Sequence, residues 1–327
     1  MPYKVAVADS VFPNLDPAKE VLAKIGAELQ LASAPTPDAI MKIAADADAV
    51  LVTYAKITGD MIAKMPKVRI ISRFGIGVDN VDIPAATAAG IVVTKVPDYC
   101  IDEVSDHTMA LLLSVVRKIP FINAKVHAGE WKMPDVVPIG RLRGSTIGLV
   151  GFGRIPQLVV PKAQSFGMKV VAFDPFAPRE VFQKLGVEQV DFEQLLKVSD
   201  YVSIHCPLTP ETKGLLNADA FRKMKKTAYV VNTARGPIID EAALAAALDA
   251  KEIAGAALDV MTQEPPGSSP LFGRPNVIIT PHTSFYSIEA LVELQTKATQ
   301  EVVSVLSGQA PRNPVNPEAV AKATAKR

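Results

Sequence analysis

One stretch of the chain, residues 145–175, constrains the fold more than any other. Its first apolar run, Ile147–Val150, is long enough for a buried strand and too short for a helix. A G-F-G turn at 151–153 follows, then an apolar segment of helical length and a second apolar run that ends at Asp174. This order, with an acid about 20 residues after the glycines, is typical of a unit that binds a dinucleotide.

The residue types in this stretch are suited to binding a dinucleotide. Glycine lets the backbone turn sharply and approach a pyrophosphate, and the next helix offers unpaired N–H groups at its N-terminus. The donors predicted to face the phosphates are those of Arg154 and Ile155. Asp174 would accept hydrogen bonds from both hydroxyls of the adenosine ribose and repel a 2′-phosphate, which predicts NAD as the cofactor. The alternative for Gly151 and Gly153 is a tight turn between a strand and a helix.

Two prolines depart from the dinucleotide-binding pattern. Pro156 stands where a third glycine is expected. Proline is tolerated in the first turn of a helix, because its missing N–H would have had no partner there. Pro161 lies deeper in the expected helix and is predicted to bend it.

Length and charge limit the remaining possibilities. A chain of 327 residues is too long for one ordinary core, so two domains are expected. The 35 basic and 34 acidic residues form no run of like charge that suggests nucleic acid or a membrane surface. No apolar stretch reaches membrane-spanning length, and the chain enters the strand-like segment Lys4–Ala8 without a signal peptide. No metal site is predicted.

The two cysteines indicate the redox setting of the protein, and the composition of the tail indicates how well it is ordered. Cys100 and Cys206 provide no disulfide framework, which indicates a reducing, cytoplasmic setting. Cys206 lies between a histidine and a proline at a predicted strand end, and we interpret it as a packing residue rather than a nucleophile. The alanine- and lysine-rich tail from Glu318 has little to bury and is predicted to fray.

Short apolar runs alternate with helix-length amphipathic segments along the whole chain, which favours parallel α/β sheets. Helical patterns lie between the runs, for example at Ala18–Ile25 and Pro37–Ala45. Before the glycine turn, the predicted strands are Val5–Ala8, Glu28–Leu31, Ala49–Thr53, Arg69–Ser72 and Ile91–Val93. From the glycine turn onward, they are Ile147–Val150, Lys169–Phe173, Tyr201–His205, Ala228–Asn232, Gly255–Asp259 and Val277–Thr280.

Two long helical patterns indicate how the domains are connected. Ile101–Val116 precedes the second group of strands, and Tyr286–Leu306 follows it with no strand left to pair with locally. Both are therefore predicted to be crossings between domains. The cofactor domain would then be inserted into a discontinuous substrate domain, with a cleft between them. The predicted boundaries are 1–100 and 286–327 for the substrate domain and 101–285 for the cofactor domain.

The four histidines differ in their surroundings. His127 lies in a polar stretch and is predicted at the surface, and His107 lies inside a crossing helix, where a capping or interface role is expected. His205 ends a predicted strand, where ligands lie in open α/β sheets, so it either contacts the cofactor or shapes a turn. His282 follows a strand at the junction that leads back to the first domain. It is the histidine best placed to face the cleft.

Three side chains after neighbouring strands could act together. Singly, Arg235 would be interpreted as a surface ion pair and Glu264 as a solvated carboxylate. Together with His282 they form a set that suits hydride transfer to a 2-keto acid. Arginine can bind a carboxylate bidentately and polarise the adjacent carbonyl, and histidine can exchange the hydroxyl proton near neutral pH. A carboxylate beside the imidazole favours and orients its protonated form.

The chain resembles the D-isomer-specific 2-hydroxyacid dehydrogenase family over essentially its full length. The matching motifs are G-L-V-G-F-G-R-I, F-D-P, H-C-P-L-T-P-E-T, V-N-T-A-R-G-P-I-I-D, A-L-D-V-M-T-Q-E-P-P and T-P-H-T-S-F-Y-S. The resemblance implies two doubly wound parallel-sheet domains, a flavodoxin-like substrate domain and an inserted Rossmann cofactor domain. It also implies an NAD-dependent oxidoreductase that acts on a D-2-hydroxy acid or 2-keto acid and forms a homodimer.

The resemblance assigns roles to individual residues. Arg235, Glu264 and His282 would be the catalytic triad, and Asp259 would contact the nicotinamide carboxamide. The other expected cofactor contacts are Thr108, Gly151, Gly153, Arg154, Ile155, Asp174, His205, Cys206, Pro207, Thr212, Thr233 and Ala234. The expected substrate contacts are Arg73, Gly75, Ile76, Gly77 and Phe285.

The residues around Arg73 and Phe285 are most similar to the branch that contains the C-terminal binding proteins. In that branch an aromatic at the place of Phe285 approaches the substrate, and tryptophan is the more familiar occupant. A dinucleotide-sensing corepressor-like protein is therefore one alternative function, and a formate or phosphite dehydrogenase is another. The triad favours the D-2-hydroxyacid dehydrogenase, because a sensor has no need of it.

Arg73 has two possible roles. With Arg235 it could clamp the substrate carboxylate from the opposite wall of the cleft, which is the interpretation we favour. Alternatively, it pairs with Asp79 or Asp82 and braces its own loop.

Overall fold

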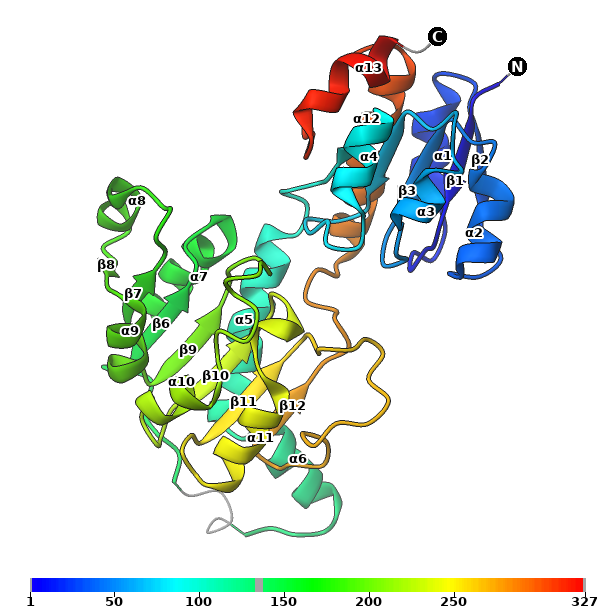
Figure 1. The fold of residues 1–327 in the computed structure, drawn as a ribbon. Coiled ribbons are helices and arrows are strands. Elements are labelled where there is room, and N and C mark those ends of the chain that lie inside the picture. The colour runs from blue at the N-terminus through cyan, green and yellow to red at the C-terminus, as the bar shows by residue number, and fades with distance from the viewer. Residues whose placement is uncertain (1, 133–137, 326–327) are drawn as a thin grey trace. The chain divides into compact units, whose positions relative to one another are not determined.

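The computed structural model describes residues 2–132 and 138–325, and the chain divides into two compact units. The first unit comprises Met1–Tyr99 and Ser287–Arg327, and the second unit comprises Cys100–Tyr286. Each unit has its own parallel sheet with helices packed on its faces (Figure 1).

The first unit contains a five-stranded sheet of order β2-β1-β3-β4-β5, in which all neighbouring strands are parallel. This is the doubly wound order of flavodoxin-like sheets. The central strands are formed by continuous apolar runs because both faces of the sheet are covered. The strands are β1 (Lys4–Val7), β2 (Glu28–Leu31), β3 (Ala49–Val52), β4 (Ile70–Arg73) and β5 (Val92–Thr94).

Helices from both ends of the chain cover this sheet. The long helix α12 returns from the second unit and packs against α1, β3 and β4. Its N-terminus is capped by Ser287, whose side chain accepts a hydrogen bond from the N–H of Ala290. The helices are α1 (Asp16–Ala23), α2 (Pro37–Ala44), α3 (Gly59–Ile62), α4 (Ile83–Ala89), α12 (Ile288–Leu306) and α13 (Val320–Ala325).

The second unit contains a seven-stranded parallel sheet of order β12-β11-β10-β9-β6-β7-β8. Six of these strands, from β8 to β11 across the sheet, have the Rossmann order, and the order reverses between β6 and β9. The strands are β6 (Thr146–Val150), β7 (Lys169–Phe173), β8 (Glu188–Gln189), β9 (Tyr201–Ile204), β10 (Tyr229–Asn232), β11 (Gly255–Leu258) and β12 (Val277–Ile279).

Two hydrophobic clusters lie on the two faces of this sheet. Successive strand residues alternate between them, so that Val230 packs with α10 and α11 while Val231 packs with α5 and α7. The helices are α5 (Ile101–Val116), α6 (Ile119–His127), α7 (Arg154–Ser165), α8 (Arg179–Lys184), α9 (Phe192–Val198), α10 (Ala218–Lys223) and α11 (Glu241–Asp249).

The prediction of two doubly wound parallel-sheet domains is confirmed, and no predicted strand differs from the observed one by more than one residue at either end. The short edge strand β8 was not predicted. Helix α7 continues through Pro161, which is exposed. No helix among residues 2–132 and 138–325 has the length and apolar character that crossing a membrane requires.

The prediction that the tail frays is wrong for the described residues. After Glu318 the chain forms α13, and the Ala323 side chain is fully buried. The buried guanidinium of Arg69 holds this helix in place, since its Nε donates to the Ala323 carbonyl at 2.7 Å and its Nη2 to the Val305 carbonyl at 2.7 Å. The alanine side chains were expected to bury little area, but their small size allows this close packing.

Candidate active site

The glycine turn lies where the strand order of the second unit reverses. Gly151 has a φ of +94°, and a Cβ atom at this position would lie 2.7 Å from the backbone nitrogen of Cys206. Only glycine fits there, because the loop after β9 crosses so closely. Helix α7 then begins at Arg154, with Pro156 in its first turn, so the N–H groups of Arg154 and Ile155 have no partner within the helix.

Asp174 directly follows β7 and faces the glycine turn. Its Oδ2 accepts a hydrogen bond from the N–H of Phe152 at 2.7 Å. Its Oδ1 accepts from the N–H groups of Phe176 at 2.8 Å and Ala177 at 3.1 Å. These three bonds fix the carboxylate and leave about one acceptor position for a further donor, since an ionised carboxylate has about four.

The first two residues of the loop after β9, His205 and Cys206, carry no charge at neutral pH. The Ser203 hydroxyl lies 2.8 Å from Nε2 of His205, and burial lowers the pKa of His205 to about 3. Burial raises the pKa of the Cys206 thiol to about 11, with a smaller contribution from the nearby Asp174. The Thr212 hydroxyl donates to the Pro207 carbonyl at 2.7 Å and so shapes the loop.

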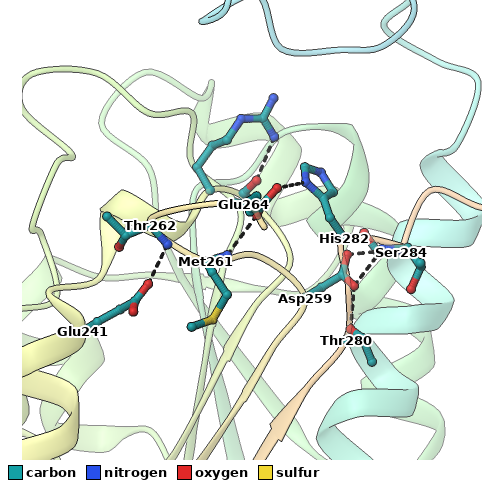
Figure 2. A network of polar contacts seen from close by, with 11 residues as sticks. Glu241, Asp259, Met261, Thr262, Glu264, Thr280, His282 and Ser284 are labelled. Carbon is teal, nitrogen blue, oxygen red and sulfur yellow. Dashed lines mark hydrogen bonds and ion pairs between the residues drawn. The ribbon is translucent and has the colours of Figure 1, made fainter. Parts of the chain in front are cut away.

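Two loops bring Glu264 and His282 together (Figure 2). His282 follows β12 and Glu264 follows β11, and Nδ1 of the imidazole lies 2.6 Å from Oε2 of the carboxylate. The other carboxylate oxygen accepts the N–H of Met261 at 2.9 Å, which fixes Glu264 on its own loop. Because Glu264 occupies Nδ1, a proton exchanged with a ligand would pass through Nε2.

A second acid anchors the loop that carries Glu264. Glu241, in the first turn of α11, accepts the N–H of Thr262 at 2.5 Å, as Figure 2 shows. Sequence reasoning did not identify this contact. The acid-rich start of a helix was visible in the sequence, but nothing indicated which backbone group it would bind.

Arg235 leaves the end of β10 next to the same loop. The side chain of Asn232 holds this turn, accepting the N–H of Ala234 at 2.9 Å and donating to the Arg235 carbonyl at 2.9 Å. At Gly236 a Cβ atom would lie 2.0 Å from the carbonyl carbon of Met261. Glycine therefore lets the arginine turn pack directly against the loop of Glu264.

Asp259 is a buried carboxylate that accepts several hydrogen bonds from the residues around His282. Its side chain accepts the Thr280 hydroxyl at 2.5 Å and the N–H groups of Thr283 and Ser284 at 2.9 Å each. Its carboxylate is thus already committed to the loop that carries His282. The predicted cofactor contacts Thr108 and Thr233 lie close by one another, with their hydroxyl oxygens 3.0 Å apart.

The predicted substrate residues are distributed over both units. Phe285 lies in the second unit with its ring edge-on to His282, at 6.2 Å between ring centroids. Arg73, at the end of β4 in the first unit, is buried and packs its guanidinium over Gly75. Gly75 has a φ of +151°, which residues with a side chain rarely adopt, and a Cβ atom there would displace the guanidinium. Asp82 caps α4 by accepting the N–H of Ala85.

Comparisons with known proteins give one consistent result. A sequence model of the D-isomer specific 2-hydroxyacid dehydrogenase, NAD binding domain, matches residues 109–284. The D-3-phosphoglycerate dehydrogenase of Methanocaldococcus jannaschii is 40% identical over 315 residues, which cover 96% of this chain and 59% of that protein. The chain therefore spans somewhat more than half the length of this relative.

Two solved structures are similar over nearly all of both chains. The TT0316 protein of Thermus thermophilus is 34% identical with a TM-score of 0.87, and the match covers 95% of this chain and 99% of that one. The D-lactate dehydrogenase of Aquifex aeolicus, solved with NAD and lactic acid, is 27% identical with a TM-score of 0.87, covering 96% and 99%.

Proposed function

The chain belongs to the D-isomer specific 2-hydroxyacid dehydrogenase family, and on that premise we propose that it interconverts a D-2-hydroxy acid and a 2-keto acid with NAD. The observation that carries the proposal is the 2.6 Å contact between Glu264 and His282. A carboxylate-held imidazole on the same sheet as a glycine turn is the arrangement that general acid–base catalysis beside a dinucleotide requires.

The residues of the second unit fit NAD. Gly153, at the N-cap of α7, has open space where a side chain would stand, so a pyrophosphate could approach the backbone at the start of the helix. Asp174 would hold the adenosine ribose, and the uncharged side chains of His205 and Cys206 would lie beside the cofactor without opposing its charge. When bound, the cofactor supplies or accepts the hydride.

The side chains would carry out the remaining steps of keto acid reduction. Arg235 binds the substrate carboxylate and polarises the neighbouring carbonyl. His282 donates the proton from Nε2 to the carbonyl oxygen as the hydride reaches the carbon. Glu264, hydrogen-bonded to Nδ1, orients the ring and stabilises the positively charged imidazolium before the transfer.

The curated relatives suggest the first substrate to test. The Methanocaldococcus jannaschii relative carries the name D-3-phosphoglycerate dehydrogenase, which supports that branch of the family rather than the branch that contains the C-terminal binding proteins. The similarity to corepressors remains a prediction from the sequence, as do the homodimer and the cytoplasmic setting. Cys100 and Cys206 form no disulfide bond in the part of the chain that the structure describes.

A substrate panel tests the proposed function. The full chain is mixed with NADH and, in separate reactions, 3-phosphohydroxypyruvate, hydroxypyruvate, pyruvate and glyoxylate, and NADH absorbance is followed. We expect turnover with at least one keto acid and its loss in His282→Asn. NADH binding without turnover of any keto acid, and without reduction of NAD⁺ by formate or phosphite, would instead support the dinucleotide-sensing alternative.

A further inference from the structure

We propose that His107, Thr280 and Asp259 form a hydrogen-bonded chain that positions His282, with His107 and Thr280 as positioning residues. The inference rests on the proposed function for its kinetic consequence. It adds two residues that neither the motifs nor the comparisons assign. All of the contacts lie within the second unit.

The series of hydrogen bonds begins at a carboxylate that is buried away from water. Asp259 is 1% exposed, so its charge must be balanced by donors. Two of these donors, the N–H groups of Thr283 and Ser284, belong to the loop of His282. The carboxylate therefore fixes the backbone on the C-terminal side of the histidine, as Figure 2 shows for Ser284.

Thr280 links this carboxylate to a second histidine. Its hydroxyl has one proton and donates it to Asp259 at 2.5 Å, so the same oxygen can only accept from Nε2 of His107 at 3.2 Å. The distance from Nε2 to Asp259 Oδ1 is 3.6 Å, too long for a direct hydrogen bond. His107 thus acts on Asp259 through Thr280.

The loop needs such support because His282 has an unfavourable backbone conformation. Its φ is +53°, in the left-handed region that a side chain with a Cβ seldom adopts. Its N–H donates to the Asp259 carbonyl at 2.8 Å and lies 3.0 Å from the Thr280 carbonyl. Asp259 and Thr280 thus hold the backbone of His282, and the Thr280 hydroxyl joins the two residues to each other. Loss of this hydroxyl should therefore let the imidazole ring of His282 move relative to Glu264.

His107 comes from α5, an element that carries neither member of the catalytic pair. His107 would therefore fix the position of the His282 loop relative to helix α5, and not only relative to the neighbouring strand. A purely structural alternative is that these bonds merely tie α5 to β12. That alternative predicts lower thermal stability without any change at His282.

Matched variants separate the two interpretations. Thr280→Val and His107→Leu remove the bonds, whereas Thr280→Ser keeps the hydroxyl and His107→Gln keeps a donor at the ε position. Thr227→Val removes an exposed hydroxyl elsewhere and serves as the control. Turnover of the full chain is measured with the keto acid found by the panel, together with the melting temperature of each variant.

We expect kcat to fall about tenfold in Thr280→Val and severalfold in His107→Leu, below the hundredfold that a 1 Å misplacement can cause. KM for NADH should stay within about twofold, and Thr280→Ser and His107→Gln should recover most of kcat. A lowered melting temperature with unchanged kcat in both disruptive variants would overturn the proposal.

A second measurement does not depend on turnover. The proton that His282 Nδ1 shares with Glu264 should give a downfield NMR signal in protein labelled at histidine nitrogen, assigned by its loss in His282→Asn. We expect this signal to broaden or shift in Thr280→Val and to persist in Thr280→Ser. If no keto acid is turned over, the proposed function fails, while the signal still tests the positioning. An unchanged signal in Thr280→Val contradicts the proposal.

Discussion

At the residue scale, the proposed chemistry depends on two side chains that hold one another. His282 and Glu264 are 21% and 32% exposed at their side chains, so their contact is neither fully solvated nor fully buried. A short, charge-assisted bond in such a setting is stronger than a surface ion pair and needs less desolvation than a buried one. The imidazole is therefore held in one orientation while its Nε2 edge can still meet a ligand.

Replacing His282 by asparagine should remove proton transfer and leave cofactor binding intact. We expect kcat to fall by ~10²–10⁴, the scale of a lost general acid. The dissociation constant for NADH should change by less than about twofold, because none of the proposed cofactor contacts involves this side chain. Stopped-flow kinetics and NADH fluorescence titration measure the two quantities. Near-normal turnover in His282→Asn would show that another group supplies the proton.

Cys206 should be a slow thiol despite its partial exposure. Burial raises its pKa to about 11, and the thiolate is the reactive form. At pH 8 its alkylation by iodoacetamide should be roughly two hundredfold slower than that of a thiol with a pKa near 8.5. The rate should rise about tenfold per pH unit up to the pKa. Mass spectrometry of the modified peptide measures this rate, and an unstructured cysteine peptide in the same reaction serves as the reference.

At the scale of elements, the ends of β6 and β7 decide which dinucleotide fits. Asp174 is fixed there by three backbone N–H groups, so it cannot swing away from a 2′-phosphate. The prediction is a preference for NAD over NADP of ~100-fold in kcat/KM, since lost ribose bonds and repulsion together cost about 3 kcal/mol. Initial rates with NADH and NADPH test it. Comparable efficiency with NADPH would contradict it.

The end of the chain provides a second prediction at this scale. Arg69 is 5% exposed and donates to carbonyls at the C-terminal ends of α12 and α13, where positive charge is favoured. Arg69→Met keeps the apolar stem but leaves buried carbonyls without donors, at a cost of about 3 kcal/mol. The melting temperature should then fall by roughly 6–12 °C. Arg69→Lys, which keeps the charge, should lose less, and equal losses would contradict the hydrogen-bond explanation.

The same elements show what the sequence could and could not predict. Most strands were predictable because they are short apolar runs between helical patterns, and strand ends located the polar residues. Strand β8 has two residues and no apolar run. The order of α13 depends on Arg69, more than 200 residues earlier, and the bond between His107 and Thr280 joins residues 173 apart. No local pattern encodes such contacts, because they arise only when distant elements pack.

The positions of the candidate site residues could be predicted from the sequence, but their catalytic roles are not tested by the structure. The strand ends predicted Arg235, Glu264 and His282 as a set, and the resemblance implied that they are a catalytic triad. The structure places Glu264 against His282 and the arginine turn against the loop of Glu264. The roles themselves remain predictions until the variants are measured. Arg73 shows why: its guanidinium packs over Gly75, and this contact is compatible with a brace as well as with substrate binding.

At the scale of the whole molecule, the chain consists of two units with separate hydrophobic cores. Among the described residues, a cluster of buried side chains lies on one face of the sheet in the first unit, and two others line the faces of the sheet in the second unit. All of the proposed cofactor contacts lie in the second unit. A ligand stabilises only the part of a protein whose unfolding releases it, so NADH should act on the two units unequally.

Hydrogen exchange with and without NADH tests this expectation. At about 100 times the dissociation constant, NADH stabilises the bound state by about 2.7 kcal/mol, so amides of β6, β9 and β10 that open only by unfolding should exchange about 100-fold more slowly. Amides of β1 and β3 in the first unit should change by less than about twofold. NADPH at the same concentration should protect β6 far less, because Asp174 opposes its binding. Equal protection of β1 and β6 by NADH would mean that the two units unfold as one cooperative body, in spite of their separate cores.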